Sequence, residues 1–195
     1  MLQFIGFMLL IIGSVYPLSL QAQPRIHHDA IVIRQGLSYR GDQLFTGVTY
    51  SLWENDSIRI ERTWRNGVLH GPINEYYKTG ILAKVSMYQN NELTGEGLEY
   101  YPDGTLSRRI YYQLHLPSGR YEAFFPNGQL QIKGVMKNGL WNGPYEEYYP
   151  NGQLKIKSTR IQDGWEGSYE EYLESGALLL KGRYRNGVFK KSRGE

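Results

Sequence analysis

The sequence of 195 residues contains no cysteine, and this absence removes several functional classes. Without a thiol the chain forms no disulfide, performs no thiol catalysis, builds no cysteine-ligated zinc site and carries no lipid on an N-terminal cysteine. A strong charge of one sign is also missing, because 22 lysines and arginines oppose 19 aspartates and glutamates. The net charge of +3 does not indicate nucleic-acid binding without a basic face. We therefore expect no nucleic-acid partner.

Sequence motifs of the common enzyme classes are missing as well. No G-x-S-x-G motif occurs, and no G-x-G-x-x-G or Walker loop follows an expected strand. The paired acids Glu146-Glu147 and Glu170-Glu171 could suggest glycoside hydrolysis, but that chemistry needs two carboxylates facing each other across a cleft. Acids that recur in successive copies of a repeat are more typical of a structural role.

Histidine is scarce, and none of the four histidines stands in a metal-ligand pattern. His27 and His28 are adjacent, so their side chains point in opposite directions on an extended chain. His70 and His115 fall in expected turns and do not recur in phase. We therefore expect that the protein is not an enzyme and has no catalytic residue, cofactor or metal site.

The N-terminal segment differs from the rest of the chain. Residues 1–24 contain no charged side chain, and residues 4–16 are almost wholly apolar. This composition predicts a secretory signal peptide over residues 1–22, with Ala22 as the last residue before cleavage. An uncleaved N-terminal anchor is the alternative, because the stretch approaches the ~20 residues that span a bilayer. Both interpretations predict an exported protein in the periplasm, at the cell envelope or secreted.

Glycine, in contrast, is abundant and recurs at a fixed interval of 24 residues. The leading series is Gly47, Gly71, Gly95, Gly119, Gly143 and Gly167. A second series, followed two residues later by leucine, is Gly80, Gly104, Gly128, Gly152 and Gly176. A period of this length indicates an array of one supersecondary unit. The expected array covers residues 47–190, with a lead-in strand and a degenerate half repeat at 23–46 and a basic tail at 191–195.

Each unit reads as strand, turn and strand. In the unit 119–142, residues 120–125 are rich in aromatics, Pro126-Asn127-Gly128 is a turn signal, and residues 129–135 follow as a second strand. These segments are too short for a helical period. The sequence therefore predicts an all-β fold that consists of six 24-residue β-hairpin repeats.

The turn residues favour a three-residue loop over a two-residue loop. A two-residue type I′ loop needs positive φ at both central positions, which Thr79 and Ser175 tolerate poorly. A type I turn closed by a left-handed glycine needs positive φ at the glycine alone. This loop predicts three aromatic–leucine pairs across the hairpins: Tyr76 with Leu82, Phe124 with Leu130, and Tyr148 with Leu154.

Charged residues favour the other register. A two-residue loop would place four glutamates directly opposite lysines: Glu75 and Lys84, Glu122 and Lys133, Glu146 and Lys157, Glu170 and Lys181. Exposed ion pairs contribute little free energy, so the backbone requirement should prevail. We therefore expect these charges to meet diagonally.

A second turn connects one hairpin to the next. The pair Asn-Gly occupies it at 66–67, 138–139 and 186–187, and Asn90-Asn91 replaces it conservatively. Leu114-His115 and Gln162-Asp163-Gly164 depart from this pattern, as Asp56 departs from the glycine of the hairpin turn. Because of these departures, we expect the spacing of the hairpins to be less regular at these places. An apolar side chain two residues beyond this turn is expected to pack beneath the next hairpin: Leu69, Leu93, Trp141, Phe189 and, shifted relative to its turn, Trp165.

The stretch GPYEEYYPNGQL at 143–154, with its copies over 47–190, resembles the MORN repeat in its bacterial variant form. The resemblance implies hairpins stacked into one elongated, twisted antiparallel sheet. It also implies a scaffold or protein-binding surface, and contact with anionic lipid headgroups has been proposed for the family. Many bacterial relatives are called antitoxins of toxin–antitoxin pairs. An antitoxin meets its toxin in the cytoplasm, whereas this chain begins with an expected export signal.

Aromatic residues suggest a candidate binding surface. One series, Tyr77, Tyr101, Phe125 and Tyr149, is called the aromatic ladder below; it adjoins a second series, Tyr76, Tyr100, Phe124, Tyr148 and Tyr172. Adjacent strand residues face opposite sides, so one series is expected to be exposed if the other is buried. The ladder, with Trp141 and Trp165, could grip a partner protein or stack on sugar rings. The alternative is that both series only stabilise a thin sheet.

These observations favour an exported, non-enzymatic repeat scaffold that mediates protein–protein interaction at the cell envelope. One alternative is a cell-wall or glycan-binding module that uses the exposed aromatic ladder. Another is an antitoxin-like partner of a toxin. The end hairpins leave strand edges open, so a homodimer through the sheet edges is also plausible.

Overall fold

The computed structural model describes residues 23–192, so the expected signal peptide or anchor at 1–22 lies outside the described residues. In the described part, the only helical segment is η1, a 3-10 turn at His28–Ala30. The remaining elements are strands: β1 Arg25–His27, β2 Val32–Arg34, β3 Leu37–Arg40, β4 Gln43–Leu44, β5 Gly47–Leu52, β6 Ile58–Arg65, β7 Val68–Tyr76, β8 Leu82–Gln89, β9 Glu92–Leu93, β10 Gly95–Tyr100, β11 Leu106–Gln113, β12 Leu116–Phe124, β13 Leu130–Lys137, β14 Leu140–Tyr148, β15 Leu154–Ile161, β16 Gly164–Tyr172, β17 Leu178–Arg185 and β18 Val188–Lys191.

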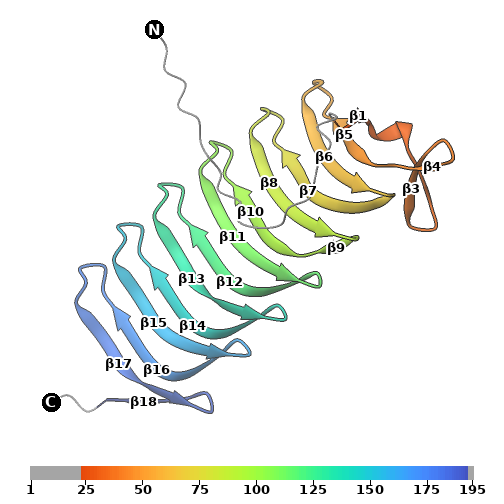
Figure 1. Cartoon of the computed structure of the whole chain (residues 1–195). Coiled ribbons are helices and arrows are strands. Elements are labelled where there is room, and N and C mark those ends of the chain that lie inside the picture. The colour runs from red at the N-terminus through yellow and green to blue at the C-terminus, as the bar shows by residue number, and fades with distance from the viewer. Residues whose placement is uncertain (1–22, 193–195) are drawn as a thin grey trace, which may run out of the picture.

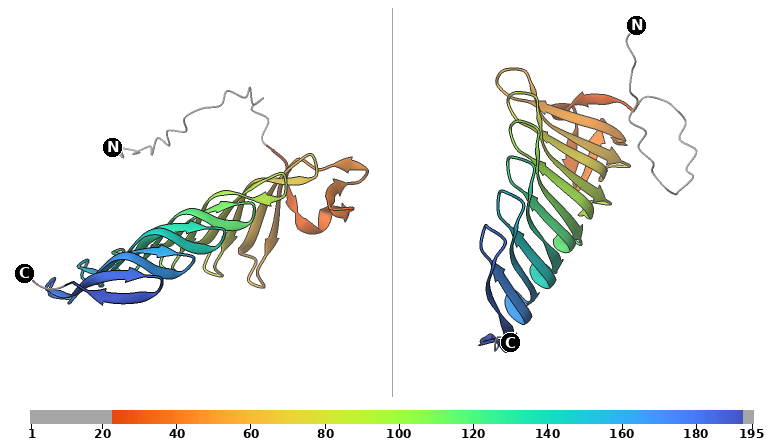
Figure 2. Two further views of the ribbon diagram at one scale, coloured as in Figure 1. Left: turned by 90° about the horizontal axis from the view of Figure 1, so that it is seen from below. Right: turned by 90° about the vertical axis from the view of Figure 1, so that its left-hand side faces the viewer.

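The strands from β5 onward form one large sheet in which chain neighbours are also spatial neighbours. This sheet has 15 strands, with β1 on its N-terminal edge and β18 on its C-terminal edge. All its pairs are antiparallel except that of β1 with β5. Figure 1 shows the hairpins side by side, and Figure 2 shows the elongated sheet twisting along its length. The prediction of an all-β, twisted array of hairpins is confirmed.

The turn within each hairpin is the three-residue loop expected from the sequence. In the hairpin of β14 and β15, the Gly152 N–H donates to the Tyr149 carbonyl at 2.8 Å, and the Tyr149 N–H donates to the Gln153 carbonyl at 2.8 Å. Gly152 has φ 85°, while Asn151 is not among the described residues with positive φ. A left-handed residue is thus needed at one position only, which glycine occupies without a steric cost.

The register of the hairpins corrects one prediction. Tyr148 pairs with Leu154 as expected, yet Glu146 also lies directly opposite Lys157. The register shifts by one residue between Glu147 and Tyr148, so a β-bulge makes both pairings compatible. The same shift occurs in the neighbouring hairpins. The expectation of a diagonal arrangement of these charges is therefore wrong, because it assumed an unbroken ladder.

The turns between hairpins have a two-residue form with positive φ at both positions. Leu114 and His115 adopt φ 48° and 67°, and Gln162 and Asp163 adopt φ 48° and 66°. The departures from Asn-Gly therefore do not disturb the 24-residue spacing. Since Gln162 and Asp163 form the turn, Trp165 is in register with Trp141, and the expected shift is wrong.

Side chains at the second turn position explain why glycine can be replaced there. Each side chain accepts a hydrogen bond from a backbone N–H of the preceding hairpin. The three pairs are Asn91 Oδ1 with Leu69 N at 2.7 Å, His115 Nδ1 with Leu93 N at 3.4 Å, and Asp163 Oδ1 with Trp141 N at 2.7 Å. These bonds between hairpins offset the steric cost of a left-handed non-glycine residue.

One face of the sheet, called the inner face, carries most of the buried side chains. Its central row pairs a large residue with a small one across each hairpin. The pairs are Ile73 with Ser86, Tyr121 with Gly134, Tyr145 with Ser158 and Tyr169 with Gly182. Small partners leave room for the rings, so a single sheet covers its own aromatic side chains. The opposite face, called the outer face, carries Glu122, Lys133 and Glu146.

Residues 23–46 cover the N-terminal end of the array. Here β1 pairs with β5 at the edge of the array, while β2, β3 and β4 form a separate three-stranded sheet. Ile31, Phe45 and Trp64 form a buried cluster, against which Ile26 and Leu69 pack. The first hairpins are thus shielded from solvent at this end, as a terminal repeat requires.

Candidate functional site

The aromatic ladder connects consecutive hairpins. The hydroxyl of each tyrosine donates to a backbone carbonyl in the next hairpin: Tyr77 to Tyr100 at 2.6 Å, Tyr101 to Phe124 at 2.8 Å, and Tyr149 to Tyr172 at 3.0 Å. Phe125 occupies the same position without a hydroxyl. All four rings are half-buried, because each lies against the following hairpin. The ladder therefore has a structural role, and its binding of a partner stays a prediction.

Trp141 and Trp165 lie in a different place, on the inner face near the opposite end of the strands. They belong to a chain of edge-to-face aromatic contacts in which Tyr121, Trp141, Tyr145, Trp165 and Tyr169 follow one another with ring centroids 4.8–5.7 Å apart. The guanidinium of Arg160 lies 3.2 Å from the Trp165 ring centroid. Both tryptophans are half-buried. The structure thus separates these two candidates from the ladder.

The outer face carries charges of alternating sign on neighbouring strands. Arg109 pairs with Glu122 at 2.7 Å, and Lys181 pairs with Glu170 at 2.8 Å. The hydrogen bond from Lys181 lowers the pKa of Glu170, with a further contribution from the Tyr172 hydroxyl. Exposed pairs of this kind stabilise the fold only slightly. Their regular alternation nonetheless gives this face a defined pattern of charge.

An exposed apolar row lies among these charges and was not predicted. Met87, Tyr111 and Val135 stand 24 residues apart, with 37%, 50% and 38% of their surface exposed. We call them the outer apolar row. A Cβ atom on Gly119 would lie 3.1 Å from the Tyr111 Cβ, so the leading glycine allows the row to lie close to the next strand. The signal in the sequence was the shared phase of these three residues with the leading glycines.

Shallow pockets adjoin this row. One of about 250 Å³ is lined by Arg120, Lys133, Val135, Pro144 and Glu146. Another, of about 180 Å³, lies beside Arg109, Tyr111 and Arg120. Arg120 lines both, so the surface around the row is continuous and combines apolar contacts with basic and acidic groups.

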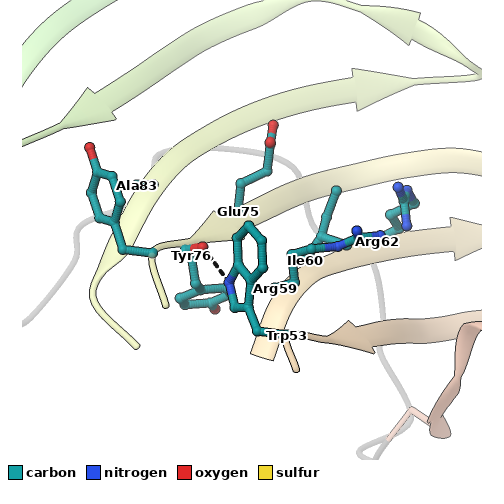
Figure 3. A pocket seen from close by; sticks show the side chains of 8 residues that line it. Trp53, Arg59, Ile60, Arg62, Glu75, Tyr76 and Ala83 are labelled. Atoms are coloured by element: carbon teal, nitrogen blue, oxygen red, sulfur yellow. Dashed lines mark hydrogen bonds between the residues drawn. The ribbon is translucent and has the colours of Figure 1, made fainter. Parts of the chain in front are cut away.

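A larger hollow lies at the first two hairpins. Trp53, Arg59, Ile60, Arg62, Glu75 and Tyr77 line a pocket of about 490 Å³, which we call the first-hairpin pocket (Figure 3). The Trp53 indole N–H donates to the Tyr76 carbonyl at 3.0 Å, shown as a dashed line, and this bond holds the ring in place. The pocket was not predicted from the sequence.

The histidines have local roles. His28 Nδ1 lies 3.4 Å from the Thr49 hydroxyl, and burial, with repulsion from Arg62, lowers the pKa of His28. His70 Nδ1 lies 3.2 Å from Asn90 Oδ1 in a turn. Within residues 23–192, no three metal-ligating side chains gather, and no helix has the length and hydropathy needed to cross a membrane.

The C-terminal end of the sheet is open. β18 pairs only with residues 182–185 of β17, so the first half of β17 has no further strand beside it among the described residues. Leu173, Leu178 and Leu179 are exposed there. In the earlier hairpins the corresponding positions are covered by the next repeat.

Comparison with known families agrees with this architecture. A family model described as the MORN repeat variant matches residues 93–114, 117–138 and 141–161. These segments start 24 residues apart and each spans one hairpin of the sheet. No curated protein matches the chain. The chain therefore contains MORN repeats of the variant type, with three consecutive copies over residues 93–161.

Proposed function

We propose that this protein is an exported, non-enzymatic scaffold that binds partner proteins at the cell envelope. MORN repeats generally serve in interaction with proteins or membranes, and the repeated surface described above suits such a role. The observation that carries the proposal is the outer apolar row, because exposed apolar side chains among fixed charges are typical of a protein-binding surface.

The charges around the row add specificity. Arg109 and Arg120 lie at the pockets beside Tyr111, and Lys133 and Glu146 lie beside Val135. Oppositely charged groups of a partner would be guided to this pattern, while like charges would be rejected. The outer apolar row provides contact area, and the flanking charges determine how a partner aligns along it.

A glycan-binding function has less support. Stacking on sugar rings needs exposed aromatic faces, whereas the ladder rings are half-buried and their hydroxyls donate to backbone carbonyls. No observation specifically favours the antitoxin alternative.

A crosslinking experiment distinguishes the outer apolar row from the aromatic ladder. A photoreactive phenylalanine analogue would replace Tyr111 in one protein and Phe125 in another, and each would be irradiated in the envelope of the source cells. We expect a defined protein adduct from position 111 that weakens at least tenfold when Met87→Ser and Val135→Ser are added. Thermal unfolding would check that these variants remain folded. Adducts from position 125 alone, or none from position 111, would contradict the proposal.

Export has its own test, which rests on the uncharged apolar segment at 1–22. The full chain and a form lacking residues 2–22 would be expressed in the source cells and located by fractionation. We expect the full chain in the envelope or medium and the shortened form in the cytoplasm. Retention of the full chain in the cytoplasm would refute export without bearing on the binding surface.

A further inference from the structure

Comparison of the repeats with one another identifies residues that the repeat architecture does not require. Trp53 stands where the later units have Tyr77, Tyr101, Phe125 and Tyr149. Arg59 stands where they have Ala83, Ser107, Gln131 and Lys155. Arg62 stands where they have Ser86, Ile110, Gly134 and Ser158, in the central row of the inner face. A side chain common to all units is explained by stacking, whereas these three are particular to the first unit.

These three residues meet in one place. All of them line the first-hairpin pocket, although Trp53 follows β5 and the two arginines belong to β6 (Figure 3). The pocket also includes Glu75 of β7 and the ring of Tyr77. Its volume of about 490 Å³ lies within the range of small-ligand sites and is large enough for a side chain with its neighbours.

Protection of the N-terminal end from solvent does not explain why the first unit differs from the later units at these three positions. The buried cluster there consists of Ile31, Phe45 and Trp64, with Ile26 and Leu69 beside it, and none of the three residues takes part. Trp64 is another residue particular to the first unit, and its burial in that cluster explains it. Arg59 and Arg62 lack such an explanation. Trp53 keeps the hydrogen bond of the ladder to the next hairpin, but this bond does not require an indole, because a tyrosine hydroxyl makes it in the later units.

The pocket also holds positive charge that the described part of the chain leaves unbalanced. Within residues 23–192, neither Arg59 nor Arg62 forms an ion pair or a side-chain hydrogen bond. Burial and the charge of Arg59 both lower the pKa of Arg62, so the two guanidinium groups repel each other. Glu75 is the single acid among the described lining residues. Nearby Lys78 already has Glu54 as a partner at 3.5 Å.

The aromatic groups beside these charges are fixed in position. The Arg59 guanidinium lies 5.9 Å from the Trp53 ring centroid, and the Trp53 indole is held by the Tyr76 carbonyl. The Tyr77 hydroxyl is bound to the next hairpin, so its ring is held as well. A ligand would therefore meet rigid apolar walls next to two guanidinium groups.

We propose that the first-hairpin pocket binds an acidic side chain of a partner protein, with an adjoining apolar residue packed on Trp53 and Tyr77. This inference rests on the proposed protein-binding function and names one recognition site for it. Two arginines and one glutamate leave one positive charge, which a single carboxylate neutralises. A phosphate monoester carries about −1.5 to −2 charges and would face Glu75 with a surplus of negative charge. Guanidinium groups bind carboxylates through paired, charge-assisted hydrogen bonds.

The test uses the chain with the capped tripeptide acetyl-Leu-Glu-Leu-amide as the probe. Binding is followed by the ¹H–¹⁵N signal of the Trp53 indole, which the Trp53→Phe variant assigns. We expect a saturable shift with this peptide and at least tenfold weaker binding of the matched Leu-Gln-Leu peptide.

Variants taken from the next repeat are chosen so that each new residue already occurs at that place in a hairpin of this sheet. Arg62→Ser and Arg59→Ala introduce the residues of the second unit, Ser86 and Ala83. We expect each to weaken binding of the glutamate peptide at least tenfold, while Arg185→Ser, an exposed arginine of β17 far from the pocket, leaves it unchanged. Retained indole spectra and thermal transitions would show that the variants are folded.

The proposal would be overturned by the absence of a saturable shift up to the solubility limit, by equal binding of the glutamine peptide, or by unchanged binding to Arg62→Ser. Tighter binding of a phosphoserine peptide would replace the carboxylate by a phosphate and overturn it too. Because crosslinking from position 111 does not involve this pocket, failure here is distinguishable from failure of the scaffold function.

Discussion

Single hydroxyl groups connect neighbouring hairpins in this protein. In the aromatic ladder, each tyrosine donates to a carbonyl that lies 23 residues further along the chain. Trp53 makes the same contact through its indole N–H. A buried carbonyl without a donor costs free energy, so each such bond favours the stacked arrangement. Phe125 is the one member of the ladder that cannot make it.

The ladder therefore predicts a stabilising substitution. Phe125→Tyr adds a hydroxyl within reach of the Tyr148 carbonyl, and we expect the free energy of unfolding to rise by about 0.5–1.5 kcal/mol. The matched change Tyr101→Phe removes the bond to Phe124 and should lower it by a similar amount. Urea denaturation of both variants measures these changes. An unchanged midpoint for both would show that the hydroxyl bonds contribute nothing.

Titration of tyrosine sets an alkaline limit to stability. Burial, assisted by hydrogen bonds to glutamates, raises the pKa of Tyr76, Tyr148 and Tyr169 to about 12. In the unfolded chain these groups ionise near 10. Between pH 10 and 12 the unfolded state loses protons that the folded state retains, so stability is full below pH 10 and falls as pH rises.

We accordingly expect the melting temperature to drop steeply above pH 10. The triple variant Tyr76→Phe, Tyr148→Phe, Tyr169→Phe should show a smaller drop, whatever its stability at pH 8. Tyr111→Phe, which changes an exposed tyrosine, serves as the control. Thermal scans from pH 9 to 11.5 give the comparison, and equal slopes for wild type and triple variant would contradict the expectation.

Turns between hairpins are the next level of organisation. Their two residues both adopt positive φ, a conformation that asparagine and glycine tolerate best. Asn91, His115 and Asp163 replace glycine at the second position and bind the preceding hairpin through their side chains. Leu114, at the first position, has no such contact and is largely exposed. It is therefore a strained residue without an evident compensation.

Leu114→Asn should relieve this strain. Asparagine occupies the equivalent position at Asn66, Asn90, Asn138 and Asn186, so we expect a gain of about 1 kcal/mol in the free energy of unfolding. The control Leu116→Asn changes an exposed leucine in a strand and should give no gain. Denaturant unfolding measures both, and a loss of stability for Leu114→Asn would disprove strain at this turn.

The sequence predicted the hairpin turn and the aromatic–leucine pairing correctly, but it did not predict how the charged residues are paired. Glycine at the last loop position, with proline at the first position in three of the hairpins, admits few turn types, so the aromatic–leucine pairs could be predicted. The bulge that also aligns Glu146 with Lys157 could not be recognised from the 24-residue spacing of the repeats. It arises because strand pairing accommodates an additional residue on one side, which only the folded hairpin reveals.

At the scale of the whole molecule, the two ends differ. β1 and the small sheet cover the N-terminal end. At the other end, half of β17 has no strand beside it among the described residues, and Leu178 and Leu179 are exposed there. An open edge with apolar side chains favours association with another strand. Because both copies would present the same edge, pairing of like edges closes into a dimer instead of a filament.

We therefore expect two copies to join through antiparallel β17 strands. Light scattering over protein concentrations from about 5 to 200 μM should show a dimer, and Leu179→Lys should shift it to the monomer, since an edge lysine opposes strand pairing. Leu114→Lys, exposed elsewhere, is the control. A wild-type monomer over the whole range would rule out this contact.

Sequence alone determined the period, the all-β class, the hairpin turns and the family resemblance, because each depends on residues close together in the chain. Positive φ at Gly152 and the pairing of Tyr148 with Leu154 are such local consequences. Tertiary structure decided which surfaces remain open. The outer apolar row and the first-hairpin pocket bring together side chains from different strands, and stacking decides which of them stay exposed. Burial is a property of neighbours in space, so these sites became visible only once the hairpins were stacked.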